Sequence, residues 1–432
     1  MTIIKNIIII DCKNGNDHLL VNGINGAVDV IHEKEKNIIE KWIKYNVIVP
    51  CDEYEQELYT KLKSREYILT QSEETNRKGK IIEKMKNKHH NRIESSSVWF
   101  VLTYGCNFDC PYCYESKIRK NIVITTEMVD KVFEINSHID RIGFFGGEPL
   151  LPSSKRIIEY IIGKASRDTE YRVITNGYYL KEYLDIFKQI KTTNIQVTLD
   201  GSEEKHNRTR RLKNGDPTYK RIIDGIKQYI YSDIPITVRM NISPENVNDC
   251  FNEKKKIQST DWGAKVKFEL QPLFQLHRQE NTRLYNQMFV ENSTMRDNQI
   301  LSRLLPISNF LYNGTSLKPI IRACDRDGKS RFYDPNGNIY NCILAVGDDS
   351  KSIGNYFPDV ALKEKSFMTR DITKIEKCMS CPYALFCGGG CPNGLSGDKD
   401  IFSPNCTSMI NEIENTIPLI YKMRQDGKQN DE

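Results

Sequence analysis

The sequence contains no hydrophobic run long enough to cross a membrane, because a transmembrane helix needs about 20 apolar residues in succession. The isoleucine-rich run at residues 3–10 is also short for the core of a signal peptide, and no small-residue cleavage site follows it. Neither a membrane span nor an export signal is therefore indicated. We expect a cytoplasmic protein without a membrane partner.

A strong charge of one sign is also missing. The net charge of +5 on 432 residues is mild, and it does not by itself indicate a nucleic-acid partner. With 28% charged and 39% hydrophobic residues, the composition is that of a globular protein. The length allows two or three domains, each with a core of its own.

Cysteine, by contrast, is abundant, with thirteen residues, and in a cytoplasmic chain these favour metal ligands over disulfides. Cys106, Cys110 and Cys113 form a C-x3-C-x2-C array directly after the apolar run 98–102. Three thiolates can bind three irons of a four-iron cluster and leave the last iron open. A structural zinc site is the alternative, but no cysteine or histidine follows soon after Cys113 to complete it.

The N-terminal segment, residues 1–71, reads as a small independent module. Its apolar runs are separated by Asn-Gly pairs, which predict the tight turns of a three-stranded meander. Apolar periodicity then predicts helices at 33–45 and 52–63, so we expect a winged-helix-like arrangement. Residues 72–96 are rich in charge and predict a solvated linker.

Residues 97–317 alternate between short apolar runs and helical patterns, which predicts an α/β fold with a parallel sheet or barrel. In such folds the active site lies at the carboxyl ends of the strands. The predicted strands are 98–103, 142–145, 171–175, 195–199, 236–242 and 266–270. The final segment, 318–432, is loop-rich and cysteine-dense, so metal is expected to hold it together.

The second predicted strand ends in Gly146, Gly147, Glu148 and Pro149. Two glycines let a ligand approach the backbone closely, and the glutamate supplies a charge opposite to that of a cation. Together with the cysteine array and its aromatic Tyr112, this motif resembles the radical S-adenosylmethionine (SAM) superfamily. The resemblance implies a partial (β/α)6 barrel, with a [4Fe-4S] cluster on the three cysteines and SAM on its open iron.

The resemblance also implies SAM contacts at the ends of later strands. The positions concerned are Thr175, Asn176, Thr198, Asp200, Arg210 and Arg239. His206 and Arg210 keep the spacing of a peptide-modifying branch of the superfamily, which implies that Arg210 lies near the SAM carboxylate. From the residues alone, Asn176 and Asp200 could equally cap the following turns and helices.

The implied chemistry begins with one electron from the reduced cluster, which cleaves SAM homolytically. The resulting 5′-deoxyadenosyl radical abstracts a hydrogen atom from an unactivated carbon of the substrate. A flavodoxin or ferredoxin is the implied electron donor. The cofactor supplies the difficult step, while the protein positions the substrate and excludes water.

A second cysteine pattern resembles the SPASM extension of this superfamily, which carries two auxiliary [4Fe-4S] clusters. It consists of Cys324, Cys342, Cys378, Cys381, Cys387, Cys391 and Cys406. The family topology implies one cluster on Cys378, Cys381, Cys387 and Cys406, and another on Cys324, Cys342 and Cys391. A zinc ribbon would explain only the four cysteines from 378 to 391.

The set of Cys324, Cys342 and Cys391 is one ligand short of a closed cluster. We hypothesise an open iron there that binds a substrate cysteine thiolate. Three other side chains could equally complete the site, namely Asp325, Asp327 and Cys250.

The N-terminal module resembles the precursor-recognition element of ribosomal-peptide maturases, in which a leader peptide adds as a strand to a sheet edge. A DNA-binding winged helix is the alternative, but the acidic residues on both predicted helices disfavour phosphate contact.

We therefore expect a radical SAM/SPASM oxidoreductase that modifies a ribosomally made precursor peptide. The expected product is a cysteine thioether cross-link, as in sactipeptides and ranthipeptides. The alternatives are an anaerobic sulfatase-type maturase that makes formylglycine, a carbon–carbon cross-linking or epimerising enzyme, and a non-catalytic iron–sulfur or zinc sensor.

Overall fold

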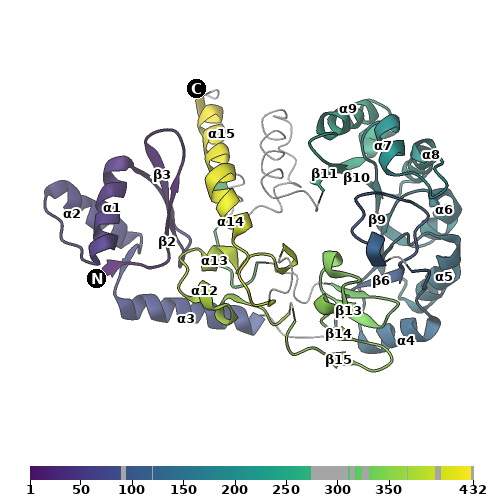
Figure 1. The fold of residues 1–432 in the computed structure, drawn as a ribbon, viewed down its shortest axis with the longest axis horizontal. Helices are drawn as coiled ribbons and strands as arrows, with labels where there is room; N and C mark the ends of the chain where they lie inside the picture. Colours follow the sequence, from purple (N-terminus) through teal and green to yellow (C-terminus); the bar gives the residue numbers. More distant parts are fainter. Residues whose placement is uncertain are drawn as a thin grey trace. The chain divides into compact units, whose positions relative to one another are not determined.

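The structure is a computed structural model that describes residues 1–88, 94–118, 120–273, 310–311, 317–323, 330–366, 368–394 and 400–429. The chain divides into two compact units (Figure 1). The first unit comprises Met1–His90, Tyr285–Asp325 and Arg370–Glu432, and the second comprises Asn91–Leu284 and Arg326–Thr369. Residues 326–369 thus group with the preceding α/β segment, while the expected domain limits at 71, 96 and 317 remain predictions.

The second unit contains a parallel sheet, which confirms the expected α/β fold. Its strands are β6 (Ser97–Thr103), β7 (Arg141–Gly146), β8 (Glu170–Thr175), β9 (Lys191–Thr198), β10 (Ile236–Ile242) and β11 (Lys267–Pro272). These six strands lie in sequential order and each pairs in parallel with the next. Their carboxyl ends therefore share one edge of the sheet.

Helices line the outer side of these strands (Figure 1). They are α4 (Thr126–Ile135), α5 (Lys155–Lys164), α6 (Leu180–Lys188), α7 (Glu203–Thr209), α8 (Tyr219–Ile230) and α9 (Val247–Gln258). In α8, Ile222, Ile226 and Tyr229 are fully buried, and their spacing places them on one helical face. Helix α4 begins after Thr125, whose side chain accepts a hydrogen bond from the backbone of Met128.

Four short strands extend this sheet beyond β6. They are β12 (Arg331–Tyr333), β13 (Asn338–Tyr340), β14 (Gly354–Asn355) and β15 (Ala361–Leu362). Strand β12 runs parallel to β6, and the other three continue as an antiparallel meander. The buried Asp334 accepts a 2.7 Å hydrogen bond from the hydroxyl of Tyr104, so this extension is tied to the chain just after β6.

The first unit contains a three-stranded antiparallel sheet, as the Asn-Gly turns predict. The strands β2 (Ile7–Asp11), β3 (Asp17–Asn22) and β4 (Val28–His32) form the sheet, and β1 (Thr2–Ile3) pairs with β5 (Ile68–Leu69). Gly15 and Gly26 adopt φ angles of +89° and +78° in the two turns, which only glycine adopts at little cost. Helices α1 (Glu33–Tyr45), α2 (Glu53–Ser64) and α3 (Gln71–Lys88) follow. The winged-helix description of this module remains a prediction.

Both faces of this small sheet are covered. One face packs on α1 and α2 through a core that includes Leu20, Ile39 and Trp42. The other face packs mainly against the C-terminal part of the chain. There Ile8 and Val21 share a hydrophobic core with eight residues from beyond position 310, namely Leu311, Leu317, Phe386, Cys387, Met409, Ile417, Ile420 and Tyr421. The C-terminal elements are α12 (Glu376–Met379), α13 (Ala384–Cys387), α14 (Thr407–Asn411), a π-helix (Glu412–Thr416) and α15 (Ile417–Gln429).

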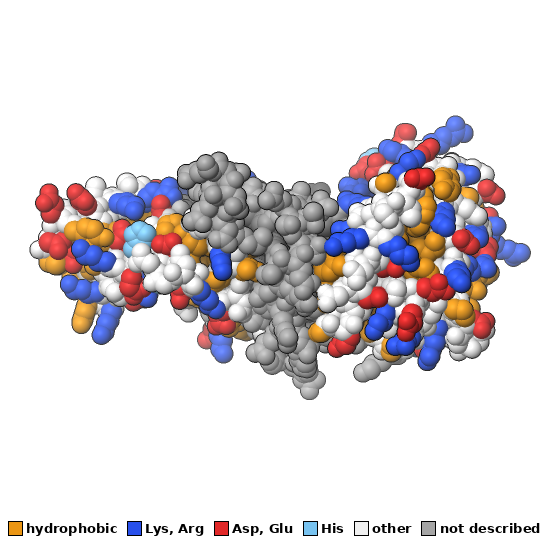
Figure 2. All heavy atoms as spheres, turned by 90° about the horizontal axis from the view of Figure 1, so that it is seen from above, with side chains coloured by type: hydrophobic (Ala, Val, Ile, Leu, Met, Phe, Trp, Pro, Cys, Tyr) orange, Lys and Arg blue, Asp and Glu red, His pale blue; other side chains and the backbone are white. Residues whose placement is uncertain are grey.

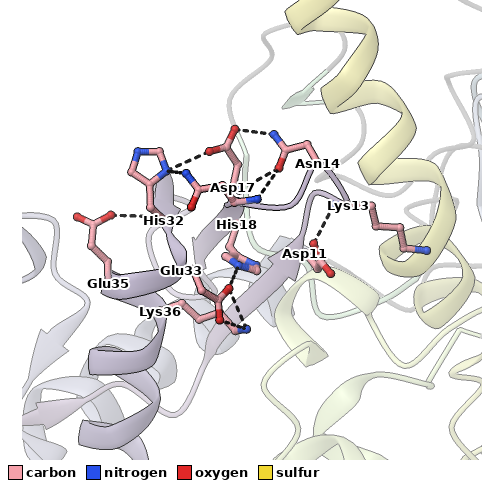
Figure 3. Close-up of polar contacts among 10 residues, drawn as sticks. Asp11, Lys13, Asn14, Asp17, His18, His32, Glu33, Glu35 and Lys36 are labelled. Atoms are coloured by element: carbon pink, nitrogen blue, oxygen red, sulfur yellow. Dashed lines mark hydrogen bonds and ion pairs between the residues drawn. The ribbon is translucent and has the colours of Figure 1, made fainter.

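Polar contacts fix the junction of β3, β4 and α1 (Figure 3). The Asp17 carboxylate lies 3.0 Å from Nδ1 of His32. It also accepts a hydrogen bond from the hydroxyl of Tyr421. Nε2 of His18 lies 2.6 Å from the carboxylate of Glu33. The end of the edge strand β4 is therefore held in place on the side of α15 as well as on the side of α1.

No described helix is both long and apolar enough to span a membrane. On the surface drawn in Figure 2, acidic and basic side chains alternate over the described parts of the chain.

Two isoleucines of α1 provide a matched test of this core. Ile39 is 0% exposed, whereas Ile43 is 43% exposed. Replacing Ile39 with alanine leaves a cavity and should destabilise the module by about 2–4 kcal/mol, while Ile43→Ala should change its stability by less than about 0.5 kcal/mol. Hydrogen exchange of peptides from β2 and β3 measures the difference. Equal exchange in both variants would contradict the packing.

Candidate functional site

The three cysteines of the C-x3-C-x2-C array lie in the loop that follows β6. Cys110 is buried, and Cys106 and Cys113 are partly exposed. The loop is anchored at its start, where the amide of Gly105 donates to Oγ1 of Thr103 at 3.0 Å. It is also anchored across the sheet, because the amide of Asp109 donates to the carbonyl of residue 211 at 3.0 Å.

The glycines after β7 are required by the contact between two loops. A Cβ atom on Gly146 would lie 2.2 Å from the carbonyl oxygen of Thr103, and one on Gly147 would lie 2.4 Å from that of Gly105. Hydrogen bonds of 2.9 and 2.8 Å join the amides of Gly147 and Glu148 to the same two carbonyls. The glycines therefore let the motif lie directly against the cysteine loop, in addition to any approach of a ligand.

Glu148 links the ends of two strands. Its carboxylate is 0% exposed and accepts hydrogen bonds from the Leu150 amide at 2.9 Å, the Thr175 hydroxyl at 2.6 Å and the Asn176 amide at 2.7 Å. Burial raises the pKa of Glu148, while these hydrogen bonds act in the opposite direction. The carboxylate thus positions the end of β8, a role that the sequence did not reveal. Pro149, the last residue of the motif, is buried beside it.

Asn176 connects this strand end to the cysteine loop. Its side-chain amide donates to Oδ1 of Asn107 at 2.8 Å and lies 3.8 Å from the sulfur of Cys106. Its Oδ1 accepts from the amide of Tyr178 at 2.9 Å. A hydrogen bond to a cysteine ligand is one way in which a protein tunes an iron–sulfur cluster. The sequence left open whether Asn176 caps the following turn or lies at the site. The structure shows that it does both.

Asp200, after β9, joins a second network around Tyr112. The Tyr112 hydroxyl donates to Asp200 and accepts from Nη1 of Arg210 at 2.7 Å. Burial raises the pKa of Asp200, although the positive charge of Arg210 opposes that shift. Asn241, at the end of β10, lies 3.4 Å from the same carboxylate. The network joins the cysteine loop to the ends of β9 and β10.

Arg210 has donor capacity left for a ligand. The side chain is 8% exposed, and its Nε has no hydrogen-bond partner among the described residues. Burial opposes its charge, but Tyr112 and Cys110 favour it, and the pKa of Arg210 rises further above its usual range. A buried cation with an unused donor beside the cysteine loop suits a carboxylate ligand.

His206 positions this arginine rather than facing the site. It is fully buried, its Nδ1 lies 3.3 Å from the amide nitrogen of Asp200, and its Nε2 lies 3.1 Å from the Thr218 hydroxyl. Thr218 in turn donates to the carbonyl of Arg210 at 2.6 Å. Burial lowers the pKa of His206 well below its usual range, so the ring is neutral.

The remaining predicted SAM contacts, Thr198 and Arg239, lie on neighbouring strands. They pair with each other across β9 and β10. Nε of Arg239 lies 3.3 Å from Oδ1 of Asn241, so it is close to the Asp200 network. Sequence reasoning missed Asn107 and Thr209, whose side chains also join these networks, because a single Asn or Thr carries no motif of its own.

In the first unit, Cys378, Cys381, Cys387 and Cys406 line one cavity of about 280 Å³ together with apolar residues such as Ala384 and Met409. Burial and neighbouring thiolates raise the pKa of Cys378 to about 11 and that of Cys387 to about 12. Within the described ranges, no three Cys, His, Asp or Glu side chains are already converged on a metal position. Cys378 and Cys387 resist ionisation without a compensating cation, and the four-cysteine lining fits an iron–sulfur cluster, which binds thiolates.

The other expected auxiliary ligands are in different places. Cys342 packs beside Tyr104 and Phe145 in the second unit, and Cys391 is exposed in the first. Cys324, Asp325 and Asp327 lie outside the described residues. Cys250 is fully buried on α9, where burial raises its pKa, as in an ordinary core thiol.

Comparison with known proteins agrees with this geometry. The family model of the radical SAM superfamily matches residues 100–253, which span the cysteine loop and the strand ends β7 to β10. These residues form a radical SAM domain. The superfamily uses SAM and a [4Fe-4S] cluster. Three cysteines with a nearby arginine that keeps one unused donor fit both groups.

Two curated relatives resemble this domain. A putative glycyl-radical enzyme activating enzyme of Methanocaldococcus jannaschii is 32% identical over 108 residues, which is 24% of this chain and 40% of the relative. The sporulation killing factor maturation protein SkfB of Bacillus subtilis is 26% identical over 152 residues, 34% of this chain and 36% of SkfB. The matches thus span well under half of each relative.

Solved structures share the fold over longer stretches. The structure of Streptococcus suis SuiB bound to its precursor peptide SuiA has a TM-score of 0.52 at 14% identity and covers 94% of this chain and 99% of its own. The enzyme anSMEcpe with bound AdoMet has a TM-score of 0.56 at 17% identity and covers 76% of this chain and 98% of its own.

Glu148→Gln tests the link between the two strand ends. The amide that replaces one carboxylate oxygen must face at least one of the three donors, so the variant should lose about 1–3 kcal/mol of stability. Glu159→Gln on the exposed face of α5 is the control and should change stability by less than about 0.5 kcal/mol. Hydrogen exchange of peptides from β7 and β8 is the measurement. Unchanged exchange in the Glu148 variant would contradict the proposed link.

Proposed function

We propose that this protein is a radical SAM enzyme that forms a thioether cross-link in a ribosomally synthesised precursor peptide. The observation that carries this proposal is the joint placement of the cysteine loop, the glycine motif and Arg210, whose Nε has no partner among the described residues, at one edge of the parallel sheet. The N-terminal sheet with an edge strand supports a peptide as the substrate.

Different residues of the domain would bind different groups of SAM. Cys106, Cys110 and Cys113 would hold the [4Fe-4S] cluster, which supplies the electron for reductive cleavage of SAM when bound. Arg210 would bind the SAM carboxylate through its unused Nε. The backbone at Gly146 and Gly147 would lie beside the amino group, and Glu148 keeps the end of β8 in place.

The net reaction exchanges one C–H bond and one S–H bond of the peptide for a C–S bond. SAM takes up the two electrons released and yields methionine and 5′-deoxyadenosine, and one proton is set free. The burial of the polar network at this edge of the sheet would keep water away from the carbon radical. Auxiliary clusters on the seven C-terminal cysteines, a flavodoxin or ferredoxin as donor and a cytoplasmic location belong to the same proposal.

The edge strand β4 is the proposed binding place of the leader peptide. The amide of Cys12 donates to the carbonyl of Asp17, and the amide of Asn22 donates to that of Ala27. Antiparallel alternation from these two bonds turns the N–H and C=O of Val28 and Val30 toward the open edge. The guanidinium of Arg65 lies 3.5 Å from the Val28 carbonyl, so Val30 is the central open position.

A formylglycine-forming maturase of the sulfatase type is the second candidate, because anSMEcpe shares the fold over 76% of this chain. About a quarter of the chain lies outside that match, whereas the SuiB match covers 94%. Because the match to SuiB extends over more of this chain, it favours a precursor peptide as the substrate over a sulfatase.

Incubation of the reduced protein with SAM and a cysteine-containing precursor peptide encoded beside it tests the proposal. We expect 5′-deoxyadenosine and a peptide that has lost two hydrogens and no longer reacts with iodoacetamide. Loss of sulfur with gain of oxygen would indicate formylglycine instead, and loss of two hydrogens with the thiol still reactive would indicate a carbon–carbon bond. Failure to cleave SAM would refute the radical mechanism.

Two neighbouring arginines provide a control for SAM binding. Arg210→Gln removes a buried charge-assisted hydrogen bond and should weaken SAM binding by about 10- to 100-fold. Arg208 is 68% exposed and pairs with Glu204, so Arg208→Gln should leave SAM affinity unchanged. Equilibrium binding of SAM to the reconstituted protein distinguishes them. Equal affinities in both variants would exclude Arg210 from the SAM site.

Val30→Pro tests the edge-strand contact. The proline removes the outward N–H without removing a bond between β3 and β4, and should weaken precursor binding about tenfold. Val30→Thr keeps the N–H and is expected to bind the precursor normally. Isothermal titration with the precursor peptide measures both. Normal binding by the proline variant would place the leader elsewhere.

A further inference from the structure

Arg370 is a buried cation in the cysteine-rich part of the first unit. It precedes a short 3-10 helix (Ile372–Lys374) and is 4% exposed. Its guanidinium donates four hydrogen bonds, all to backbone carbonyls. The acceptors are Ile401 at 2.7 Å, Gly390 at 2.9 Å, Gly389 at 2.7 Å and Ser403 at 2.9 Å. A planar fork can span several carbonyls in this way, whereas an ammonium group cannot.

The four carbonyls belong to two segments that carry the cysteines. Gly389 and Gly390 lie between Cys387 and Cys391, while residues 401–403 lead to Cys406. The same two segments are joined by Asn405, whose amide donates to the Gly389 carbonyl at 3.0 Å and whose side chain donates to the Cys391 carbonyl at 2.8 Å. Arg370 therefore clamps together the chain segments on both sides of the four-cysteine cavity.

The glycines confirm how closely this clamp is packed. A Cβ on Gly389 would lie 3.3 Å from Nη1 of Arg370, and a Cβ on Gly390 would lie 1.8 Å from the carbonyl oxygen of Asn405. Both glycines have positive φ angles, +81° and +73°. Both positions therefore favour glycine, because of their backbone conformation and the close approach of neighbouring residues.

The charge of Arg370 has no carboxylate partner among the described residues, since all four of its hydrogen bonds go to neutral carbonyls. Burial lowers the pKa of Arg370, and the thiolates of Cys378, Cys391 and Cys387 act against that shift. An arginine remains protonated even so. A buried positive charge without a carboxylate is costly unless a negative group is bound nearby, and the nearby groups here are the cysteine sulfurs.

We propose that Arg370 is the positioning residue and fixed counter-charge of the iron–sulfur site on Cys378, Cys381, Cys387 and Cys406. This rests on the auxiliary cluster of the proposed function. A positive charge in a buried environment favours the reduced, more negative state of the site, so Arg370 raises its reduction potential. The hydrogen bonds to the loop carbonyls separately keep the ligands in place and retain the iron.

The charge and the clamp can be separated by substitution. Arg370→Gln removes the charge and most of the donors, whereas Arg370→Lys keeps the charge but cannot reach four carbonyls. Lys377→Gln is the matched control, because Lys377 is exposed and adjacent in sequence to Cys378. Water screens its charge, so its removal should leave the site unchanged.

The experiment uses the full chain, reconstituted with iron and sulfide. Cys106, Cys110 and Cys113 are replaced by alanine to remove the SAM cluster, and Cys324 and Cys342 are replaced by alanine to remove the other auxiliary cluster. Iron per chain and the midpoint potential from an EPR-monitored titration are the two readouts. We expect Arg370→Gln to shift the potential to a more negative value and to lose iron faster. Arg370→Lys should keep a potential near that of the parent while losing iron faster, and Lys377→Gln should match the parent in both.

Parental potential and iron retention in Arg370→Gln would overturn the proposal. If that variant holds no cluster at all, Arg370→Lys decides: a retained cluster with near-parental potential supports the role of the charge, and complete loss overturns it. A parent chain that binds no iron would refute the auxiliary cluster of the proposed function itself. That outcome is distinct from a cluster that binds but has the same potential and iron retention with or without Arg370.

Discussion

The contact between the loops that follow β6 and β7 is the constraint on which the rest of the site depends. Backbone atoms of Gly146 and Gly147 lie so close to the carbonyls of Thr103 and Gly105 that no side chain fits between them. Glu148 then extends this contact to β8 through hydrogen bonds with Thr175 and Asn176. Three strand ends are thereby fixed around the cysteine loop by the protein's own hydrogen bonds, which is the preorganisation that a binding or catalytic site needs.

In the first unit, one hydrophobic core supports both the small sheet and the four-cysteine cavity. Its small sheet is covered on one face by α1 and α2 and on the other by the C-terminal helices, so it shares a core with Phe386, Cys387 and Met409. Cys387 and Met409 also line the four-cysteine cavity. A peptide bound at β4 and a cluster bound in the cavity would therefore rest on one continuous core, rather than on two modules joined by a flexible linker.

Periodic segments were predictable from the sequence, and isolated contacts were not. The helix expected at 33–45 is α1, Glu33–Tyr45, and the strand expected at 236–242 is β10, because both have a strong local pattern. The strands β12 to β15 were missed because two or three residues carry no measurable period. The predicted SAM residues do gather at one edge, but the partners of Glu148 and Asn176 come from other strands and could not be read locally.

The sequence by itself determined the donor chemistry: where the cysteines are, how they are spaced, and which strand ends carry Gly, Glu, Asn, Asp and Arg. These follow from residue identity and short-range order along the chain. Only the tertiary structure decided which groups are already satisfied and which remain available. Glu148 is saturated by protein donors, whereas Arg210 keeps an unused Nε and Arg370 holds its charge among carbonyls. The physical reason is that burial and hydrogen-bond partners are set by residues distant in sequence, which meet only when the chain has folded.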